Sequence, residues 1–201
     1  MSLWLVIPTR GLAAGKTRLS SILSPGERIE FNTLSLSSVM SAFESLPASL
    51  RRCIVVSPSA DAHCLARGRG AQALEDAAAG GLNAAIEQAC RAARADGAAQ
   101  ILVLAADLPR VRNHHLKRLL DSNPVDSVTL IADKTGQGTN GLLIPAREAA
   151  GFAFGPYSLE QHQRHFGRTG RPVTIWRDPA LAFDIDTPDD LIAWRQQRAE
   201  G

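Results

Sequence analysis

The segment QILVLAADLP, residues 100–109, indicates the fold class of this chain. Seven mostly apolar residues precede Asp107, and Pro109 ends the run. An apolar run without polar alternation is typical of a strand that is covered on both faces, as in a parallel sheet between layers of helices. Asp107 would therefore stand at the carboxyl end of a buried strand, the edge at which open α/β sheets bind their ligands.

Similar runs recur along the chain and alternate with helical stretches. We expect strands at 3–8, 52–58, 100–109 and 128–133, and further strands at 140–145, 172–176 and 181–186. Helices are expected from Pro25 toward Phe43, over 81–97, 113–122 and 158–167, and from Pro188 onward. This alternation predicts an α/β three-layer sandwich around a mostly parallel, mixed sheet. It would form a single domain over residues 1–201, with an inserted hairpin and loop within 133–158.

The composition argues against several classes of protein. The hydrophobic fraction is 45% and the charged fraction 21%, as in a globular protein rather than a disordered one. A net charge of +2 is too small to indicate nucleic-acid binding. Three cysteines without a CxxC pair predict neither a disulfide framework nor a zinc site. The apolar run at 3–7 is too short for a signal-peptide core, and nothing approaches a membrane span, so we expect a soluble cytoplasmic protein that binds no membrane.

The loop PTRGLAAGKTRL, residues 8–19, has some features of a phosphate-binding P-loop. A P-loop has about four residues between its first glycine and the GK[ST] triplet. Here only three residues separate Gly11 from Gly15, and Arg10 stands where that first glycine belongs. The loop is therefore no P-loop, but the cations Arg10, Lys16 and Arg18 beside a glycine suit a polyphosphate. The alternative is a solvated basic loop.

Three aspartates follow strands that are predicted to end at the same edge of the sheet. Asp184 and Asp186 lie two positions apart on an extended segment, so their side chains leave on the same side. Paired carboxylates repel each other unless a cation compensates, and carboxylate oxygen is the ligand that Mg²⁺ prefers. With Asp107 they predict a site for Mg²⁺, for which Mn²⁺ is an acceptable substitute. The alternative for Asp107 alone is a turn or helix-capping role.

Residues near other strand ends offer further contacts. The glycines at 80 and 81, before Asn83, would let a base or ribose approach the backbone, although the same pattern is equally a helix start. Ser158 begins a helix after a glycine and a proline, and a helix start with a hydroxyl and free N–H groups is an anion site. His162 lies one turn later on the same face, where a lone histidine is more often exposed or structural.

Seven motifs, in chain order, closely resemble those of the 2-phospho-L-lactate guanylyltransferase family, the CofC type, of coenzyme F-420 biosynthesis. They are IPTRGLAAGKTRL, VVSP, GLNAAI, AADLP, GTNGLLI, FGPYSLEQH and DIDTPDDL. The resemblance implies a nucleotidyltransferase fold like that of the nucleotide-diphospho-sugar transferases. It also implies a reaction in which GTP and a phosphorylated three-carbon acid give a guanylylated acid and pyrophosphate. The acid would be 2-phospho-L-lactate, phosphoenolpyruvate or 3-phospho-D-glycerate, and the product would pass to the next enzyme of the pathway.

The resemblance also assigns roles to individual residues, in a protein that would be a monomer or a homodimer. The catalytic charges would be those of Lys16, Arg18 and Asp107. The nucleotide would contact Pro8, Arg10, Gly11, Lys16, Ser57, Gly81 and Asn83. The phosphorylated acid would contact Thr139, Gly155, Ser158 and His162. The metal would be held by Asp107, Asp184 and Asp186.

A few positions depart from the family pattern. Arg10 replaces a usual lysine, Gly15 and Thr17 replace a usual alanine and serine, and Tyr157 stands where glycine is common, beside the expected acid site. Two other functions compete with this interpretation. A molybdenum-cofactor cytidylyltransferase would begin with a LAAGxSxRMG loop, which this chain lacks. A noncatalytic nucleotide-binding protein would have no need to retain the three aspartates.

Overall fold

The computed structural model describes residues 2–47, 51–76 and 80–199. The strands are β1 (Leu3–Pro8), β2 (Arg51–Ser57), β3 (Gln72–Glu75), β4 (Gln100–Leu104), β5 (Val128–Ala132), β6 (Thr139–Pro145) and β7 (Val173–Trp176). The α-helices are α1 (Pro25–Glu44), α2 (Ala60–Gly68), α3 (Gly81–Ala95), α4 (Asn113–Ser122), α5 (Ser158–Gly167) and α6 (Pro188–Ala199). The described residues also form the short 3-10 helices η1 (Thr17–Leu19) and η3 (Ala146–Glu148). Within this part of the chain no helix is long and apolar enough to cross a membrane.

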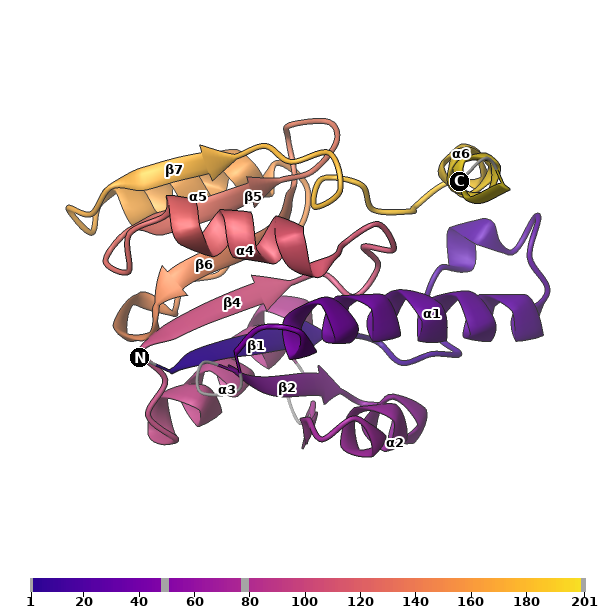
Figure 1. Cartoon of the computed structure of the whole chain (residues 1–201), viewed down its shortest axis with the longest axis horizontal. Helices are drawn as coiled ribbons and strands as arrows, with labels where there is room; N and C mark the ends of the chain where they lie inside the picture. The colour runs from indigo at the N-terminus through magenta and orange to yellow at the C-terminus, as the bar shows by residue number, and fades with distance from the viewer. Residues whose placement is uncertain (1, 48–50, 77–79, 200–201) are drawn as a thin grey trace.

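The strands form one mixed sheet in the order β3-β2-β1-β4-β6-β5-β7 (Figure 1). The neighbours β1–β2, β1–β4, β2–β3 and β5–β7 are parallel, whereas β6 is antiparallel to both β4 and β5. Within 133–158, where an inserted hairpin was expected, the strand is β6, and it pairs with β4 and β5 as part of the main sheet rather than outside it. A β-carbon at Gly141 of β6 would lie 2.5 Å from the carbonyl oxygen of Val103, so glycine is what lets β6 approach β4 this closely.

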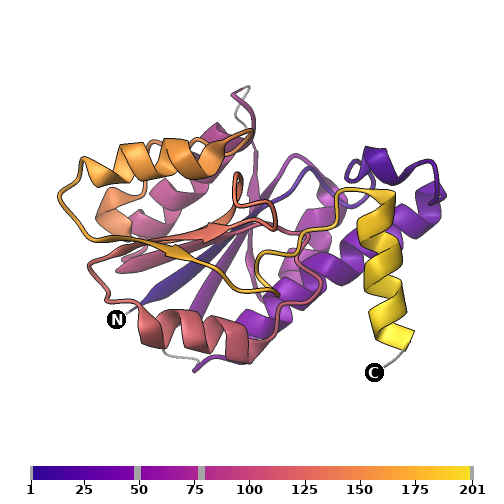
Figure 2. The ribbon, with the colours of Figure 1, turned by 90° about the horizontal axis from the view of Figure 1, so that it is seen from above.

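Helices cover both faces of the sheet, as Figure 2 shows. Alternate residues of β1 enter different cores, because successive side chains of a strand point to opposite faces. Leu3, Leu5 and Ile7 pack on the side of α1 and α4, and Trp4 and Val6 pack on the side of α3 and α5. This confirms the predicted three-layer α/β sandwich, with strands buried on both faces.

The last helix lies apart from these layers, at the far end of the molecule from the N-terminus (Figure 1). Leu191 and Trp194 of α6 form a third core with Leu19 of η1 and Phe31 of α1. The rings of Phe31 and Trp194 meet edge to face, with centroids 5.6 Å apart. This small core connects the N-terminal basic loop with the C-terminal segment that carries two of the predicted metal ligands.

The predicted strand at 181–186 is wrong, because this segment is irregular. Its backbone groups bond to side chains and to a nearby turn instead of to a neighbouring strand. The amide of Asn140 donates to the carbonyl oxygens of Leu181 and Ala182, both at 3.1 Å, and the N–H of Ala182 donates to the carbonyl of Asp178 at 2.8 Å. The structure also contains α2 and β3, which the sequence analysis did not predict.

Candidate functional site

Three segments that are distant in sequence meet at the carboxyl edge of the sheet. Lys16 follows β1, Asp107 follows β4, and Asp186 lies just before α6. The Lys16 ammonium bonds to Oδ2 of Asp107 and donates to Oδ1 of Asp186 at 2.8 Å. Only 10% of the Lys16 side chain is exposed. One cation is thus shared between two of the three aspartates that were predicted to converge.

The pKa values in this cluster reflect its shared charges. Burial alone would lower the pKa of Lys16, but the carboxylates of Asp107 and Asp186 raise it above its ordinary value. Burial would raise the pKa of Asp186, but the Lys16 ammonium lowers it below its ordinary value. Burial, the Asp107 carboxylate and the Asp186 carboxylate raise the pKa of Asp184 to about 6, against the opposing charge of Lys134. Asp184 is therefore the least compensated carboxylate of the three.

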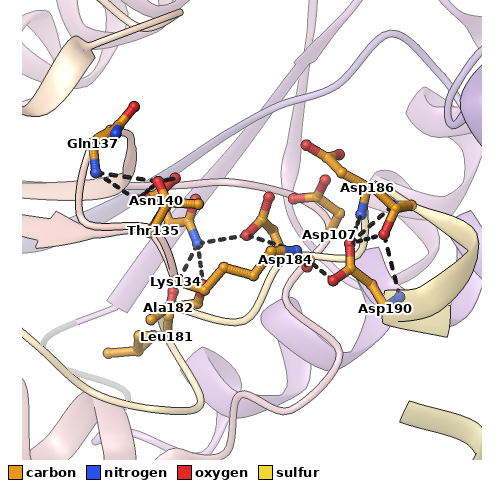
Figure 3. A network of polar contacts seen from close by, with 12 residues as sticks. Asp107, Lys134, Thr135, Gln137, Asn140, Leu181, Ala182, Asp184, Asp186 and Asp190 are labelled. Atoms are coloured by element: carbon orange, nitrogen blue, oxygen red, sulfur yellow. Dashed lines mark hydrogen bonds and ion pairs between the residues drawn. The ribbon is translucent and has the colours of Figure 1, made fainter. Parts of the chain in front are cut away.

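Asp184 is held by side chains from the β5–β6 hairpin (Figure 3). The Lys134 ammonium donates to the carbonyl of Asp184 at 2.9 Å and lies 3.9 Å from its Oδ1. The Asn140 amide, besides its two backbone contacts, lies 3.5 Å from the same Oδ1. Lys134 was not among the predicted site residues. Asn140 lies in the GTN motif, so the sequence marked this position, but it did not predict the contacts that Asn140 makes.

A second anchor of this segment is Asp190, which lies in the first turn of α6. Its Oδ2 accepts from the N–H groups of Asp186 and Thr187 at 3.0 and 2.9 Å. Its Oδ1 pairs with the Lys134 ammonium at 2.6 Å. These contacts, backbone and ionic, lower the pKa of Asp190 to about 2, although burial opposes the shift. Lys134 and Asp190 together fix the irregular segment between Asp184 and α6.

The donors fit a hard divalent cation in chemistry, and in part in geometry. All three side chains offer carboxylate oxygens, which Mg²⁺ prefers, and Lys16 demonstrates that a single cation can contact Asp107 and Asp186 together. In the described ranges, however, no group of three His, Cys, Asp or Glu side chains is close enough to hold a metal ion as it stands. A metal contact with all three aspartates would need a rearrangement of side chains.

The basic loop before η1 has a fixed backbone. The Asp61 carboxylate accepts from the N–H groups of Leu12 and Ala13, both at 3.3 Å, and the Asn32 amide donates to the carbonyl of Leu12 at 2.6 Å. Gly11 has a φ of 106°, and a β-carbon there would lie 2.4 Å from the β-carbon of Ser59. The loop exposes the cations Arg10 and Arg18, whereas Pro8 is only partly exposed at the end of β1.

Lys16 adopts a left-handed backbone conformation, with φ of 58°. Tyr157 is the other non-glycine residue with positive φ in the described part of the chain, at 56°. This conformation is costly for residues with a β-carbon, and such strain is concentrated at functional sites. Both residues lie where the sequence analysis predicted substrate contacts.

Two predicted nucleotide contacts, Asn83 and Ser57, have hydrogen-bond partners within the protein. Both polar atoms of the Asn83 side chain bond to Phe154, with Oδ1 accepting from its N–H at 2.8 Å and Nδ2 donating to its carbonyl at 3.2 Å. Ser57 is fully buried, and its hydroxyl accepts from the N–H of Ser59 at 3.1 Å. Gly81, by contrast, is exposed at the start of α3. As arranged, Asn83 connects the start of α3 to the loop before α5.

The predicted acid-binding residues gather around that loop, but unequally. Gly155 is exposed, whereas Thr139, Ser158 and His162 are 8%, 2% and 0% exposed. The N–H groups of Ser158 and Leu159 already donate to the carbonyls of Gly155 and Gln137, at 3.2 and 3.0 Å, so the expectation that they are free is wrong. His162 uses both ring nitrogens within the protein, which places it behind the site surface.

The predicted acid-binding residues adjoin the aspartate cluster through β6. Thr139 is the first residue of β6, and the next residue, Asn140, reaches Asp184. Because successive side chains of a strand point to opposite faces, Thr139 faces His162 while Asn140 faces the aspartates. The start of β6 therefore lies between the predicted acid-binding residues and the aspartates, and it contacts both groups.

Comparisons with known proteins place the chain in a family. The family model described as guanylyl transferase CofC-like matches residues 3–194. The curated phosphoenolpyruvate guanylyltransferase of Rubrobacter xylanophilus is 36% identical over 192 residues, which cover 95% of this chain and 92% of the relative. The protein of the same name from Conexibacter woesei is 30% identical over 198 residues, covering 98% and 88%.

Solved structures share the fold at low identity. A protein described as a nucleotide-diphospho-sugar transferase, from Desulfovibrio desulfuricans, has a TM-score of 0.78 at 14% identity, covering 98% of this chain and 89% of its own. A nucleotidyl transferase from Methanothermobacter has a TM-score of 0.69 at 17% identity, covering 99% and 98%. At such identity the likeness shows the nucleotidyltransferase fold alone. The family match over residues 3–194 and the 36% identity to the Rubrobacter relative establish that the chain belongs to the CofC-like guanylyl transferase family.

Proposed function

We propose that this protein transfers GMP from GTP to a phosphorylated three-carbon acid and releases pyrophosphate, as a step of coenzyme F-420 biosynthesis. The observation that carries the proposal is the meeting of Lys16 with Asp107 and Asp186, beside Asp184, in a chain of this family. A basic loop next to clustered carboxylates suits a nucleoside triphosphate and its divalent cation. The proposed acid is phosphoenolpyruvate, because the relatives from Rubrobacter and Conexibacter carry that substrate in their names.

The nucleotide would lie over the basic loop. Lys16, Arg18 and Arg10 would neutralise its phosphates, while Pro8, Gly11 and the exposed Gly81 would border it. The fixed backbone of the loop supports this role, because a preorganised set of charges stabilises a transition state without reorganising. Ser57 and Asn83 would contribute by holding the walls of the nucleotide subsite, since their polar groups bond to Ser59 and Phe154.

Asp107, Asp184 and Asp186 would hold Mg²⁺. The bound ion would supply positive charge to the triphosphate and to the leaving pyrophosphate. The raised pKa of Asp184 supports this assignment. Burial and neighbouring carboxylates destabilise its charged form, and a bound cation would stabilise that form. Lys16 would then neutralise phosphate oxygens in addition to carboxylates.

The reaction needs no covalent intermediate with the protein. An oxygen of the acid's phosphate would attack the α-phosphorus of GTP in line, forming the new P–O bond as the bond to the β-phosphate oxygen breaks. Pyrophosphate would leave with the bonding electron pair, and Lys16 and Arg18 would stabilise the charge that spreads onto it. The acid would be held at Thr139, Gly155 and Ser158, around the start of β6 and the loop before α5, with His162 behind them.

Pyrophosphate release tests the proposal. The protein would be incubated with GTP and Mg²⁺ and, separately, with phosphoenolpyruvate, 2-phospho-L-lactate or 3-phospho-D-glycerate. We expect pyrophosphate release that depends on GTP and on phosphoenolpyruvate. In a coupled assay, the next enzyme of the pathway should consume the guanylylated product. Preference for another acid would correct the substrate, and preference for CTP over GTP would favour a cytidylyltransferase. Nucleotide binding without pyrophosphate release from any acid would contradict the proposal.

A further inference from the structure

His162 is a buried histidine whose two ring nitrogens have different partners. The N–H of Ala153 donates to Nε2 at 2.9 Å, and Nδ1 lies 3.1 Å from the hydroxyl oxygen of Thr139. The ring is fully buried, and the ring of Phe154 packs on it edge to face at 4.9 Å. The histidine thus connects three segments: α5, the start of β6, and the loop that contains Gly155.

These contacts determine which nitrogen of His162 carries the proton. A backbone N–H can only donate, so Nε2 must accept and carries no proton. A ring that accepted at both nitrogens would be an anion, which does not form under ordinary conditions. Nδ1 therefore carries the proton and donates it to Thr139, whose hydroxyl oxygen is the acceptor.

The same logic fixes the Thr139 hydroxyl. A hydroxyl has one hydrogen and two acceptor lone pairs. Because one lone pair accepts from His162, the hydrogen of Thr139 is available for a different acceptor. The part of the chain that the structure describes offers this hydrogen no recorded acceptor. Thr139 is the first residue of β6 and lies beside His162, which also contacts the loop that contains Gly155, so its hydrogen is available on the side where the phosphorylated acid is proposed to bind.

We infer that His162 is a positioning residue, which as the neutral Nδ1–H tautomer turns Thr139 into a hydrogen-bond donor to the phosphorylated acid and holds the loop at 153–155 in place. The direction of the Thr139 hydrogen toward the acid rests on the proposed function. The tautomer and the attachment of the loop do not. Asn83 adds an independent attachment of the same loop, through its two bonds to Phe154.

The electrostatic surroundings of His162 agree with a neutral ring. Burial, followed by the charge of His165 on the same helix, lowers the pKa of His162 to about 4. The partners from the other two segments, Thr139 and the backbone of Ala153 with the Phe154 ring, do not titrate. The neutral form therefore holds through the neutral pH range, and Nδ1 remains a donor to Thr139.

The tautomer is measured directly by nitrogen NMR of the full chain labelled with ¹⁵N-histidine. The chain has five histidines, and the His162→Phe variant identifies the resonances of the one that it lacks. We expect a protonated Nδ1 and an unprotonated Nε2 that do not titrate between about pH 5 and pH 8. A protonated Nε2, or titration near the ordinary histidine pKa of about 6.5, would overturn the inference.

Kinetics test what the tautomer does. His162→Phe keeps a ring against Phe154 but removes both hydrogen bonds, and Thr139→Val removes the hydroxyl. We expect each variant to raise KM for the acid by about tenfold or more, with KM for GTP within about twofold of wild type. The double variant should add little to either single change, because both remove one interaction. His114→Phe, at an exposed position of α4, is the matched control and should change neither KM.

The outcomes separate this inference from the proposed function. If GTP gives no pyrophosphate with any of the three acids, the proposed function fails. The NMR spectrum then still supports or overturns the tautomer. If turnover is present, an unchanged acid KM in His162→Phe together with a raised one in Thr139→Val would overturn the positioning role. A loss of thermal stability in His162→Phe with a wild-type KM for the acid would likewise show that His162 is only a packing residue.

Discussion

The ammonium of Lys16 and the carboxylate of Asp186 pair at 2.8 Å although 170 positions of the sequence separate them. The pair joins the loop after the first strand to the segment before the last helix. The core formed by Leu19, Phe31 and Trp194 holds the same two segments together from the other side. The N-terminal cations and the C-terminal carboxylates are therefore positioned as one unit, which is what a site for a triphosphate and a divalent cation requires.

We expect Asp107→Asn and Asp186→Asn each to lower kcat by about a hundredfold or more, because each removes a charge from the proposed metal site and from Lys16. Steady-state pyrophosphate release measures the effect. The circular dichroism spectrum should stay that of wild type. Asp121→Asn, at an exposed carboxylate of α4 that pairs with Lys117, is the control and should leave kcat unchanged. Wild-type turnover in both site variants would contradict the metal assignment.

Lys134 is expected to matter for turnover through the segment that it holds. Replacement by methionine removes the ammonium that contacts the Asp184 carbonyl and the Asp190 carboxylate, so the Asp184 segment should loosen and kcat should fall by about tenfold. Lys134→Arg keeps a donor and a positive charge and should recover much of the loss. The exposed Lys117→Met, with the same change of charge on α4, is the control. A loss in Lys134→Met that arginine does not reduce would argue against this role.

The sequence predicted those parts of the fold and site that depend on local patterns. The unbroken apolar runs of β1 and β4 predicted buried strands, since both of their faces enter a core. The end of the apolar run predicted that Asp107 follows β4, and the rule that such strands end at a ligand-binding edge predicted a role for it in the site. The motif order predicted the family, which the match over residues 3–194 confirms.

What the sequence did not predict depends on contacts between distant residues. The apolar pattern of LAFDID is that of a strand, but Asn140 and Lys134, from the β5–β6 hairpin, bond to the backbone carbonyls of this segment. The edge strand β3 is four residues long and partly exposed, so it lacks an apolar run. The ring nitrogens of His162 and the polar atoms of the Asn83 side chain bond to β6 and to the loop before α5, and local sequence patterns do not reveal these partners.

Asp184 predicts a pH dependence of stability in protein kept free of metal by a chelator. Its pKa is raised to about 6 in the folded state, mainly by burial and by Asp107, so the folded state holds a proton that the unfolded state loses nearer pH 4. The free energy of unfolding should therefore fall as pH rises through this window. Asp184→Asn, which cannot ionise, should be more stable than wild type by on the order of 2 kcal/mol at neutral pH and equal to it at low pH. Urea unfolding at a series of pH values measures this difference, and a difference independent of pH would contradict it.

Tyr157 tests the cost of the strained backbone beside the proposed acid site. Its φ is 56° and the residue is 64% exposed, so it has a β-carbon in a conformation suited to glycine and little packing to offset the strain. Tyr157→Gly should raise the free energy of unfolding by about 1 kcal/mol, as measured by urea unfolding. Tyr157→Ala removes the same phenol ring but keeps the β-carbon, so it should give no such gain. Equal stabilisation by glycine and alanine would mean that the ring, rather than the backbone, is the source of the cost.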